Sequence, residues 1–583
     1  MGHFRTTVAV WLKGVFNRRL SQPHVLRSPV RPLRTVFRIL FAFALGVSYA
    51  NAQKADLVFT HAKIWTVDPE KPRAEAVAVA GERILAVGTY ALIRQYLGPK
   101  TRVIDAGGKL MLPGFIDNHT HLMSGGFQLQ SVDLRYARDE AELARLVRER
   151  AERFPGRWIT GGDWDHDNWP GAKLPTRELI DLFTAGTPVF VSRYDGHMAL
   201  ANSAALKLAG VSRQTPDPPG GAIVRDQATG EPTGVLKDEA MNLVWSHVPD
   251  PSEGEMLEAA RLALAEARKF GLTSIQDVSS DADIAVYKKL LAAGELTSRM
   301  YCRLPAWEVD RLVGEGIMAG TGDQWVKTGV LKAFADGSLG SATALFYDPY
   351  LSDPSTRGLP SEILLDGRLA TWILRGDSAR LQLSVHAIGD SANSVVLDMF
   401  EKAVKTNRAW DRRFRIEHAQ HIHPKDFSRF SRLGVIASVQ PYHAIDDGRW
   451  AEGRIGRERC MTTYPFRSFL DNRILLSFGS DWTVAPLNPL LGIYAAVTRR
   501  TTDGRNPDGW FPDQKISVQE AVKAYTINNA YAAFEEQEKG SITAGKLADF
   551  VILSDDILMI DPIAIATVKV EMTVVGGSIV YHK

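Results

Sequence analysis

The chain has 583 residues, of which 45% are hydrophobic, and this is enough apolar material for a large folded core. Its formal net charge of +2 is misleading, because residues 1–38 carry eight Lys or Arg and no Asp or Glu, which leaves −6 for the rest. No basic stripe follows this segment, so nucleic acid is not an expected partner. The two cysteines, Cys302 and Cys460, lie far apart and form no metal or redox motif.

Residues 1–52 have the organisation of a secretory signal peptide. A basic stretch precedes the apolar run 39–47, and the A-x-A tripeptide 50–52 predicts cleavage between Ala52 and Gln53. The apolar run is much shorter than the roughly 20 residues that span a bilayer. We therefore expect an extracytoplasmic protein, periplasmic or secreted, with no membrane anchor after signal removal. An Arg-rich organelle transit peptide is the alternative interpretation.

Short β-prone runs separated by turn residues occur near both ends of the remaining chain, in residues 53–108 and 536–583. Each set alone has little material for a core. We therefore predict that both sets join in one small composite β-sandwich domain.

Residues 109–535 alternate between strand-like and helix-like runs, which predicts an α/β fold. Eight strand candidates predict a TIM (β/α)8 barrel, in which the chemistry lies at the carboxyl ends of the strands. The segment 125–265, between strands one and two, is too long for an ordinary loop and is expected to be an inserted lid or subdomain. The strand candidates are 111–118, 273–278, 299–305, 329–336, 382–387, 414–419, 435–440 and 474–480.

Candidate metal ligands lie where these strands end. His119 and His121 follow the first apolar run, and side chains at i and i+2 of a strand share one face. Neutral imidazole is the commonest protein ligand for zinc and its neighbours. Four further strand ends each contribute one candidate, and these are Lys332, His386, His418 and Asp481.

Taken together, these residues resemble the amidohydrolase superfamily, in which His-x-His is followed by Lys, His, His and Asp on successive barrel strands. Several phrases are similar to the branch that includes N-substituted formamide deformylases, and the likeness runs from about residue 54 to the end of the sequence. The phrases are LKAFADGS at 331–338, HAIGD at 386–390, RIEHAQ at 415–420, GSDW at 479–482 and GSITAGKLAD at 540–549.

The resemblance implies a divalent-metal centre with one or two ions per chain, with zinc expected, although manganese, iron or nickel suits the same donors. His119, His121 and Asp481 would hold the more buried ion, and His386 and His418 the second. Lys332 cannot ligate as an ammonium, but the resemblance implies an N6-carboxylysine whose carbamate bridges both ions. Without that modification Lys332 would pair with Asp336, and a single-metal site would remain workable.

The resemblance implies a metal-dependent hydrolase of non-peptide carbon–nitrogen bonds in amide, N-acyl or N-formyl small molecules. Asp481 is the expected general base, and His386 or His418 would polarise the carbonyl group. Hydrolysis of a lactone, dipeptide or cyclic imide is the alternative within enzymes, and a catalytically idle binding or regulatory barrel is the alternative outside them. A glycosidase would need paired carboxylates such as Glu417 and Asp481, but strand alternation points Glu417 away from the face of His418.

Residues near the substrate are less well defined by the sequence. His197 and Asn202 follow a strand of the insertion and resemble a family phrase near the substrate, and Trp164 and Trp482 could line an apolar pocket. A hydrogen-bonded structural histidine and ordinary tryptophan packing are the alternatives. The expected partner is a small-molecule substrate, and a homo-oligomer is compatible with the sequence.

Overall fold

The computed structural model describes residues 53–583 except 167–168, 172, 185, 194–197, 219–220 and 341. The predicted signal peptide at residues 1–52 lies outside the described residues. None of the helices in the described ranges combines the length and the apolar character needed to cross a membrane.

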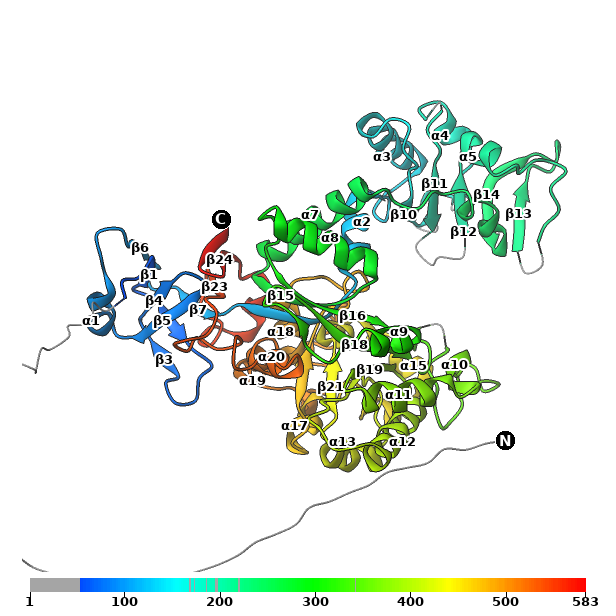
Figure 1. Ribbon diagram of the computed structural model, residues 1–583. Coiled ribbons are helices and arrows are strands. Elements are labelled where there is room, and N and C mark those ends of the chain that lie inside the picture. Colours follow the sequence, from blue (N-terminus) through cyan, green and yellow to red (C-terminus); the bar gives the residue numbers. More distant parts are fainter. Residues whose placement is uncertain are drawn as a thin grey trace, which may run out of the picture. The chain divides into compact units, whose positions relative to one another are not determined.

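Eight parallel strands form a nearly closed barrel, which confirms the predicted TIM-barrel fold (Figure 1). The seam between the last and the first strand is joined by a bridge from Thr120 to Trp482 and by the Asp481 N–H, which donates to the His119 carbonyl at 2.7 Å. In spatial order the strands are β8 (Phe115–Thr120), β15 (Leu272–Val278), β16 (Arg299–Pro305), β18 (Val326–Phe334), β19 (Gln382–Ala387), β20 (Arg415–His418), β21 (Ile436–Val439) and β22 (Leu476–Phe478).

Helices connect these strands. The main helices are α2 (Leu122–Gln130), α7 (Glu253–Lys269), α8 (Asp281–Ala292), α9 (Val309–Gly314), α11 (Arg368–Ser378), α12 (Asp390–Thr406), α13 (Phe427–Leu433), α14 (Pro441–Asp447), α17 (Phe466–Asp471), α18 (Pro489–Thr498), α19 (Val518–Ala524) and α20 (Ile527–Ala532). Of these, α7, α8, α18 and α19 begin after residues whose side chains cap them. Ser252, for example, precedes α7 and forms a capping box with Glu255, so the helix starts where the backbone N–H groups find a partner.

The first predicted strand, 111–118, is divided between two sheets. β7 (Leu110–Pro113) pairs with β2 (Lys63–Trp65) and β23 (Phe550–Leu553), whereas β8 begins at Phe115 and pairs with β15. Gly114 lies at the division, and a Cβ there would come within 2.2 Å of the Thr273 side chain. One apolar run therefore serves both the barrel and the small domain, which the hydrophobic pattern alone did not indicate.

Strands from both ends of the described chain form two sheets that pack as the predicted composite sandwich. Their shared core includes Phe59 and Val77 from one sheet and Phe550 and Val574 from the other. The sheets are β5 (Arg83–Gly88), β4 (Ala76–Ala80), β1 (Leu57–Thr60) and β6 (Arg102–Asp105), and β25 (Ser578–His582), β24 (Val570–Val575), β23 (Phe550–Leu553), β7, β2 (Lys63–Trp65) and β3 (Arg73–Ala74).

The insertion between β8 and β15 has its own six-stranded sheet and its own apolar clusters (Figure 1). A role as a lid over the site stays a prediction. Its strands, in spatial order, are β13 (Gly221–Arg225), β14 (Pro232–Asp238), β12 (Met198–Ala201), β11 (Phe190–Arg193), β10 (Gly161–Trp164) and β9 (Val132–Asp133), and its helices include α3 (Glu140–Arg153), α4 (Glu178–Asp181) and α5 (Ser203–Leu208).

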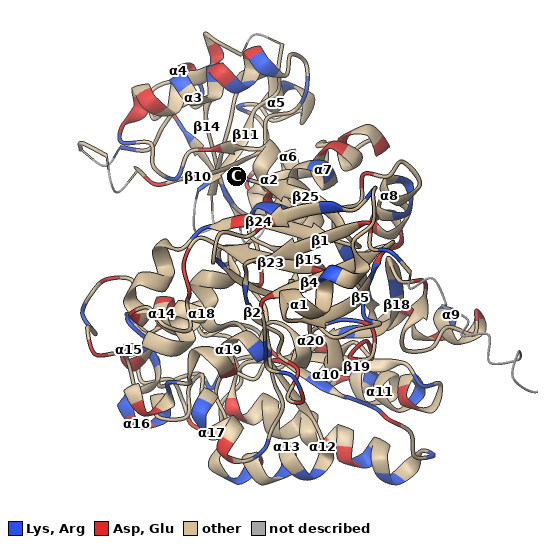
Figure 2. Ribbon diagram, turned by 90° about the vertical axis from the view of Figure 1, so that its left-hand side faces the viewer, with Lys and Arg blue, Asp and Glu red and all other residues tan. Residues whose placement is uncertain are grey.

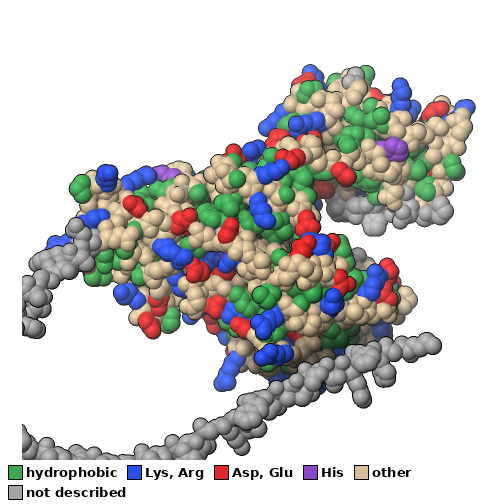
Figure 3. Space-filling model, viewed as in Figure 1, with side chains coloured by type: hydrophobic (Ala, Val, Ile, Leu, Met, Phe, Trp, Pro, Cys, Tyr) green, Lys and Arg blue, Asp and Glu red, His purple; other side chains and the backbone are tan. Residues whose placement is uncertain are grey.

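Charged residues are mixed in sign over the surface. Figure 2 shows basic and acidic positions interspersed along α11, α12 and α13, and the face drawn in Figure 3 likewise shows no single-sign stripe. These views agree with the charge distribution along the sequence.

Candidate metal centre and active site

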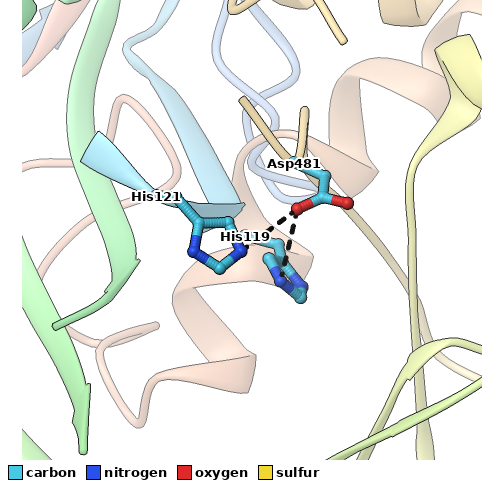
Figure 4. A group of neighbouring side chains, drawn as sticks. All are labelled: His119, His121 and Asp481. Carbon is cyan, nitrogen blue, oxygen red and sulfur yellow. Dashed lines mark ion pairs between the residues drawn. The ribbon is translucent and has the colours of Figure 1, made fainter. Parts of the chain in front are cut away.

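His119, His121 and Asp481 meet at the seam where the barrel closes (Figure 4). Asp481 Oδ1 lies 3.6 Å from His119 Nε2 and 3.4 Å from His121 Nε2. The backbone hydrogen bond from Asp481 to His119 crosses the seam, so closure of the barrel also brings the Asp481 side chain to the histidines. Burial raises the pKa of Asp481, but the facing histidines His119, His121 and His418 outweigh it and hold that pKa well below its usual range.

A buried carboxylate fixes the orientation of His119. Glu417 Oε2 lies 2.6 Å from His119 Nδ1, and Arg303 and Arg415 each approach Glu417 Oε1 to 3.0 Å. Burial alone would raise the pKa of Glu417, but the two guanidinium groups hold it well below its usual range. The ionised Glu417 therefore accepts a hydrogen bond from the Nδ1–H group of His119. This fixes the tautomer of the ring, and the Nε2 atom faces the site.

The observed position of Glu417 corrects the expectation from strand alternation. Glu417 points into the barrel beneath His119, while the His418 ring lies 5.2 Å from the His119 ring, so both side chains reach the same centre. His418 and Ala419 have left-handed backbone conformations, with φ of 70° and 41°. The side chain of His418, at the end of β20, therefore does not follow the two-residue alternation of a regular strand. Asp481 likewise has φ 56°.

Lys332 is buried beside the histidines, with its Nζ 3.2 Å from His119 Nε2. Burial lowers its pKa to about 8, which gives a substantial share of neutral amine at mildly alkaline pH. A neutral amine is the form that can react with carbon dioxide, so this environment is compatible with carboxylation. The carboxylated form itself stays a prediction.

His386, near the end of β19, and His418, the last residue of β20, lie together with ring centroids 4.5 Å apart. Burial and nearby Lys332 lower the pKa of His386 to about 4, and burial with His386 lowers that of His418 well below its usual range. Both rings are therefore neutral near pH 7, as a metal ligand requires. His386 Nε2 lies 3.0 Å from the Gly337 carbonyl, whereas His418 Nδ1 is buried without a hydrogen-bond partner in the described part of the chain.

These residues fit a divalent ion. Imidazole nitrogens and a carboxylate are the donors that zinc and its neighbours prefer, and the ligand atoms of His119, His121 and Asp481 lie within 4.8 Å of one another. The unpartnered nitrogen of His418 is a second indication, because buried polar atoms usually have a partner.

A pocket of about 380 Å³ opens beside this group. Its volume suits a small molecule, and its wall combines apolar and aromatic side chains with a few polar ones. Besides the histidines, Lys332 and Asp481, the lining residues are Phe334, Ser338, Leu339, Gly340, Ile388, Gln420, Tyr442, Asp446, Asp447, Trp450, Val484 and Ala485.

The three substrate candidates that the structure describes, Trp164, Asn202 and Trp482, are not among these lining residues. Asn202 caps α5 and bonds to Val189, Thr184 and Thr187, and Trp164 is fully buried with its Nε1 donating to the Val191 carbonyl, so both have structural roles in the insertion. Trp482 is buried next to Asp481 and packs close to Gly125. His197 lies outside the described residues.

Tyr442, His443 and Asp447 contribute to the pocket from α14, which follows β21. Of the three, only His443, which follows the seventh predicted strand, is a weak candidate from the sequence alone. A signal was available in retrospect, since in a TIM barrel the segments after each strand carry the chemistry.

The sequence profile of the amidohydrolase family matches residues 102–581. The chain therefore belongs to the amidohydrolase family. It is 40% identical over 516 residues to Protein LONG AFTER FAR-RED 3 of Arabidopsis thaliana, covering 86% of this chain and 87% of the relative. It is 29% identical over 565 residues to the N-substituted formamide deformylase of Arthrobacter pascens, covering 91% and 99%.

The fold also resembles the crystal structure of an uncharacterized metal-dependent hydrolase from Pyrococcus horikoshii OT3. The TM-score is 0.74 at 26% sequence identity, covering 87% of this chain and 99% of that one. As a member of the amidohydrolase family with this site and these relatives, the protein is a hydrolase-type enzyme.

Proposed function

We propose that this amidohydrolase cleaves a non-peptide carbon–nitrogen bond in an amide, N-acyl or N-formyl small molecule. The observation that carries the proposal is the buried group His119, His121 and Asp481 beside a mostly apolar pocket of about 380 Å³. The similarity to a formamide deformylase along 91% of this chain supports the choice of bond.

A divalent ion at these residues, with zinc expected and one or two ions per chain, would make water more acidic and polarise a substrate carbonyl. Asp481 is ionised and buried, so it is placed to accept a proton from the attacking water and to return it to the leaving nitrogen. His386 and His418 line the same pocket and would orient the carbonyl oxygen. Phe334, Leu339 and Trp450 would exclude bulk water from the reacting bond.

Turnover on a matched substrate panel tests this proposal. The purified protein, reconstituted with zinc, would be assayed with N-formyl and N-acetyl amines, lactones, dipeptides and cyclic imides. We expect amine release that requires metal and falls at least about a thousandfold in Asp481→Asn. His247→Ala, an exposed change outside the pocket, is the matched control and should keep full activity.

Faster turnover of lactones, dipeptides or cyclic imides than of any N-acyl compound would replace the proposed bond by another carbonyl bond. No metal-dependent turnover of any class would favour a binding or regulatory barrel.

We also propose that the enzyme works outside the cytoplasm, on the strength of the signal-like composition of residues 1–52. Expression of the whole chain in a Gram-negative host should yield a periplasmic protein that begins at Gln53, as measured by intact mass. Full-length protein retained in the cytoplasm would contradict export.

A further inference from the structure

A second cavity, of about 230 Å³, adjoins the active-site pocket at the end of β18, and we call it the rim cavity. Lys332 and Phe334 line both the rim cavity and the active-site pocket, and Phe334 is the last residue of β18. The centroid of the Phe334 ring lies 5.1 Å from that of the His386 ring. The two cavities therefore meet beside the metal centre.

The wall of the rim cavity is largely apolar. It is built from the end of β18, the short 3-10 helix η4 (Ala306–Glu308), the short helix α10 (Glu362–Leu365) and α11. Besides Phe334, its apolar members are Ala306, Trp307, Ala333, Ile363 and Trp372.

Three polar residues also line the rim cavity, but their polar groups have partners elsewhere. The Ser361 hydroxyl donates to the last carbonyl of β18 at 2.7 Å. The Glu362 carboxylate pairs with Arg368 at 2.7 Å, and the Lys332 amine faces the histidines of the active site. A charged ligand would find no unpaired group among these three residues, whereas an apolar group would give up no hydrogen bond on entering.

Two aromatic residues of this wall are exposed to an unusual degree, since Trp307 is 65% exposed and Phe334 is 44% exposed. Exposed apolar side chains that gather around a cavity are typical of ligand binding. A volume of about 230 Å³ holds about six to eight groups of the size of a water molecule. The rim cavity therefore suits a phenyl ring or a short alkyl chain, and it is too small for a whole drug-sized molecule.

The order of the strands in the barrel indicates which part of a substrate enters the rim cavity. β18 is the fourth strand and β22 the eighth, so they lie on opposite sides of the barrel mouth. Asp481 follows β22 and returns a proton to the leaving nitrogen in the proposed reaction. The nitrogen of the bond that breaks therefore lies on the side of Asp481, and the substituent on the carbonyl carbon extends toward β18.

We propose that the rim cavity binds the acyl group of the substrate, and that the substrates are N-acyl amines with an aryl or short alkyl acyl group. Hydrolysis adds the oxygen of water to the carbonyl carbon and breaks the carbon–nitrogen bond. A proton of that water moves to the nitrogen through Asp481, and the products are an apolar carboxylic acid and an amine. Trp307, Phe334 and Ile363 determine the specificity. The inference rests on the proposed carbon–nitrogen hydrolysis and names its substrate class.

A series of N-acyl derivatives of one amine tests this assignment. With zinc-loaded protein, we expect kcat/KM to increase about two- to fourfold with each methylene from acetyl to hexanoyl, because each methylene is removed from water. Ile363→Trp fills the cavity and should lower the hexanoyl-to-acetyl ratio of kcat/KM at least about tenfold. Ile563→Trp is the matched control and should leave this ratio unchanged, because Ile563 is 49% exposed and lies in η7 (Pro562–Thr567), outside both cavities.

Binding of the free acids gives a readout that needs no turnover. Calorimetric titration of the zinc-loaded protein should show that hexanoate binds at least about tenfold more tightly than acetate, and Ile363→Trp should abolish this difference. Trp307→Ala removes an exposed side chain and should also reduce the difference. This variant replaces Ile363→Trp if thermal unfolding shows that the larger side chain prevents folding.

Equal kcat/KM from acetyl to hexanoyl, or equal binding of acetate and hexanoate, would overturn the inference and leave the proposed hydrolysis standing. A preference for a longer amine that is lost in Ile363→Trp would also overturn it, because the rim cavity would then bind the leaving group. Selective hexanoate binding that is lost in Ile363→Trp, without hydrolysis of any amide, would support the acid-binding cavity and contradict the proposed reaction.

Discussion

At the scale of single residues, the most consequential contact is the one between Glu417 and His119. Glu417 forms ion pairs with two buried arginines and accepts hydrogen bonds from the hydroxyls of Ser384 and Ser438. It also accepts a hydrogen bond from the Nδ1–H group of His119. A carboxylate in this position fixes both the tautomer and the ring orientation of a metal-binding histidine. The polar groups beneath the site therefore determine how well His119 can bind an ion.

We expect Glu417→Gln to weaken zinc binding by about 10- to 100-fold, because a neutral amide no longer fixes the tautomer of His119. A chelator competition assay measures this directly. Ser384→Ala removes one hydrogen bond to Glu417 but keeps its charge, so its zinc affinity should change by less than about threefold. Equal zinc affinities in Glu417→Gln and the parent would show that His119 needs no such anchor.

The neutral histidines predict a pH dependence. The folded-state pKa values of His119 and His386 are about 3 and 4, below the unfolded value near 6.5. Between these values the unfolded chain binds more protons than the folded one, so the stability of metal-free protein falls as the pH decreases from about 6.5 to 4.

Urea unfolding of metal-free protein at pH 7 and pH 5 measures this loss, which is up to about 1.4 kcal/mol per pH unit for each histidine. His386→Gln should reduce the difference between the two pH values, whereas His247→Ala should not. An unchanged difference in His386→Gln would mean that His386 is not protonated on unfolding in this range.

The sequence identified the histidines and Asp481 because each follows an apolar strand, and such strands end together at one mouth of a barrel. The prediction that Glu417 points away from the site was wrong. Side chains alternate between two faces only along a regular strand, and His418 has a left-handed φ of 70°. His443 received little weight, because a single histidine on a helix after a strand has no periodic partner to mark it.

At the scale of elements, closure of the barrel depends on the seam between β22 and β8. Asn529 on α20 spans this seam, since its Nδ2 donates to the carbonyls of Ile116 and Phe478. Gly479 follows β22, and a Cβ there would lie 2.3 Å from Asn118 Oδ1 and 2.6 Å from the backbone nitrogen of His119. The site forms only if the two strands approach this closely.

Gly479→Ala should therefore destabilise the protein by about 1–3 kcal/mol or more and lower its metal content, because the added methyl group pushes Asp481 away from His119. Gly453→Ala is the matched control, since a Cβ at Gly453 meets nothing within 4 Å. Chemical denaturation and zinc content measure both effects. A stable Gly479→Ala variant with full zinc content would show that the seam can widen without cost.

Strand positions within the barrel followed well from the hydrophobic pattern, and 299–305 and 382–387 coincide with β16 and β19. The run 111–118 was the exception. Its division at Gly114 depends on the close approach of Thr273, a contact between segments far apart in the chain that no local pattern reveals.

At the scale of the whole described chain, a buried ion pair connects the barrel to the segment that leads into the sandwich. Arg299 on β16 donates to Asp549, with Nε 2.9 Å from Oδ2, and Asp549 Oδ1 also accepts the Gly576 N–H. Arg299 is 1% exposed, so its charge has no access to solvent if Asp549 is removed.

Asp549→Ala should lower the free energy of unfolding by about 3–5 kcal/mol, because it leaves a buried guanidinium without its main partner. Glu149→Gln breaks an exposed pair with Arg145 and should cost no more than about 0.5 kcal/mol. Urea unfolding of both variants makes the comparison. A loss below 1 kcal/mol in Asp549→Ala would mean that Arg299 finds other partners.

The sharing of one sheet by β7 and β23 has a consequence for biosynthesis. β7 leaves the ribosome long before β23, the strand that covers one of its edges. Until then that edge exposes unsatisfied backbone groups, and such edges invite pairing with other chains. Completion of the sandwich is therefore a late step, and factors that hold the growing chain unfolded until β23 has been made would improve its yield.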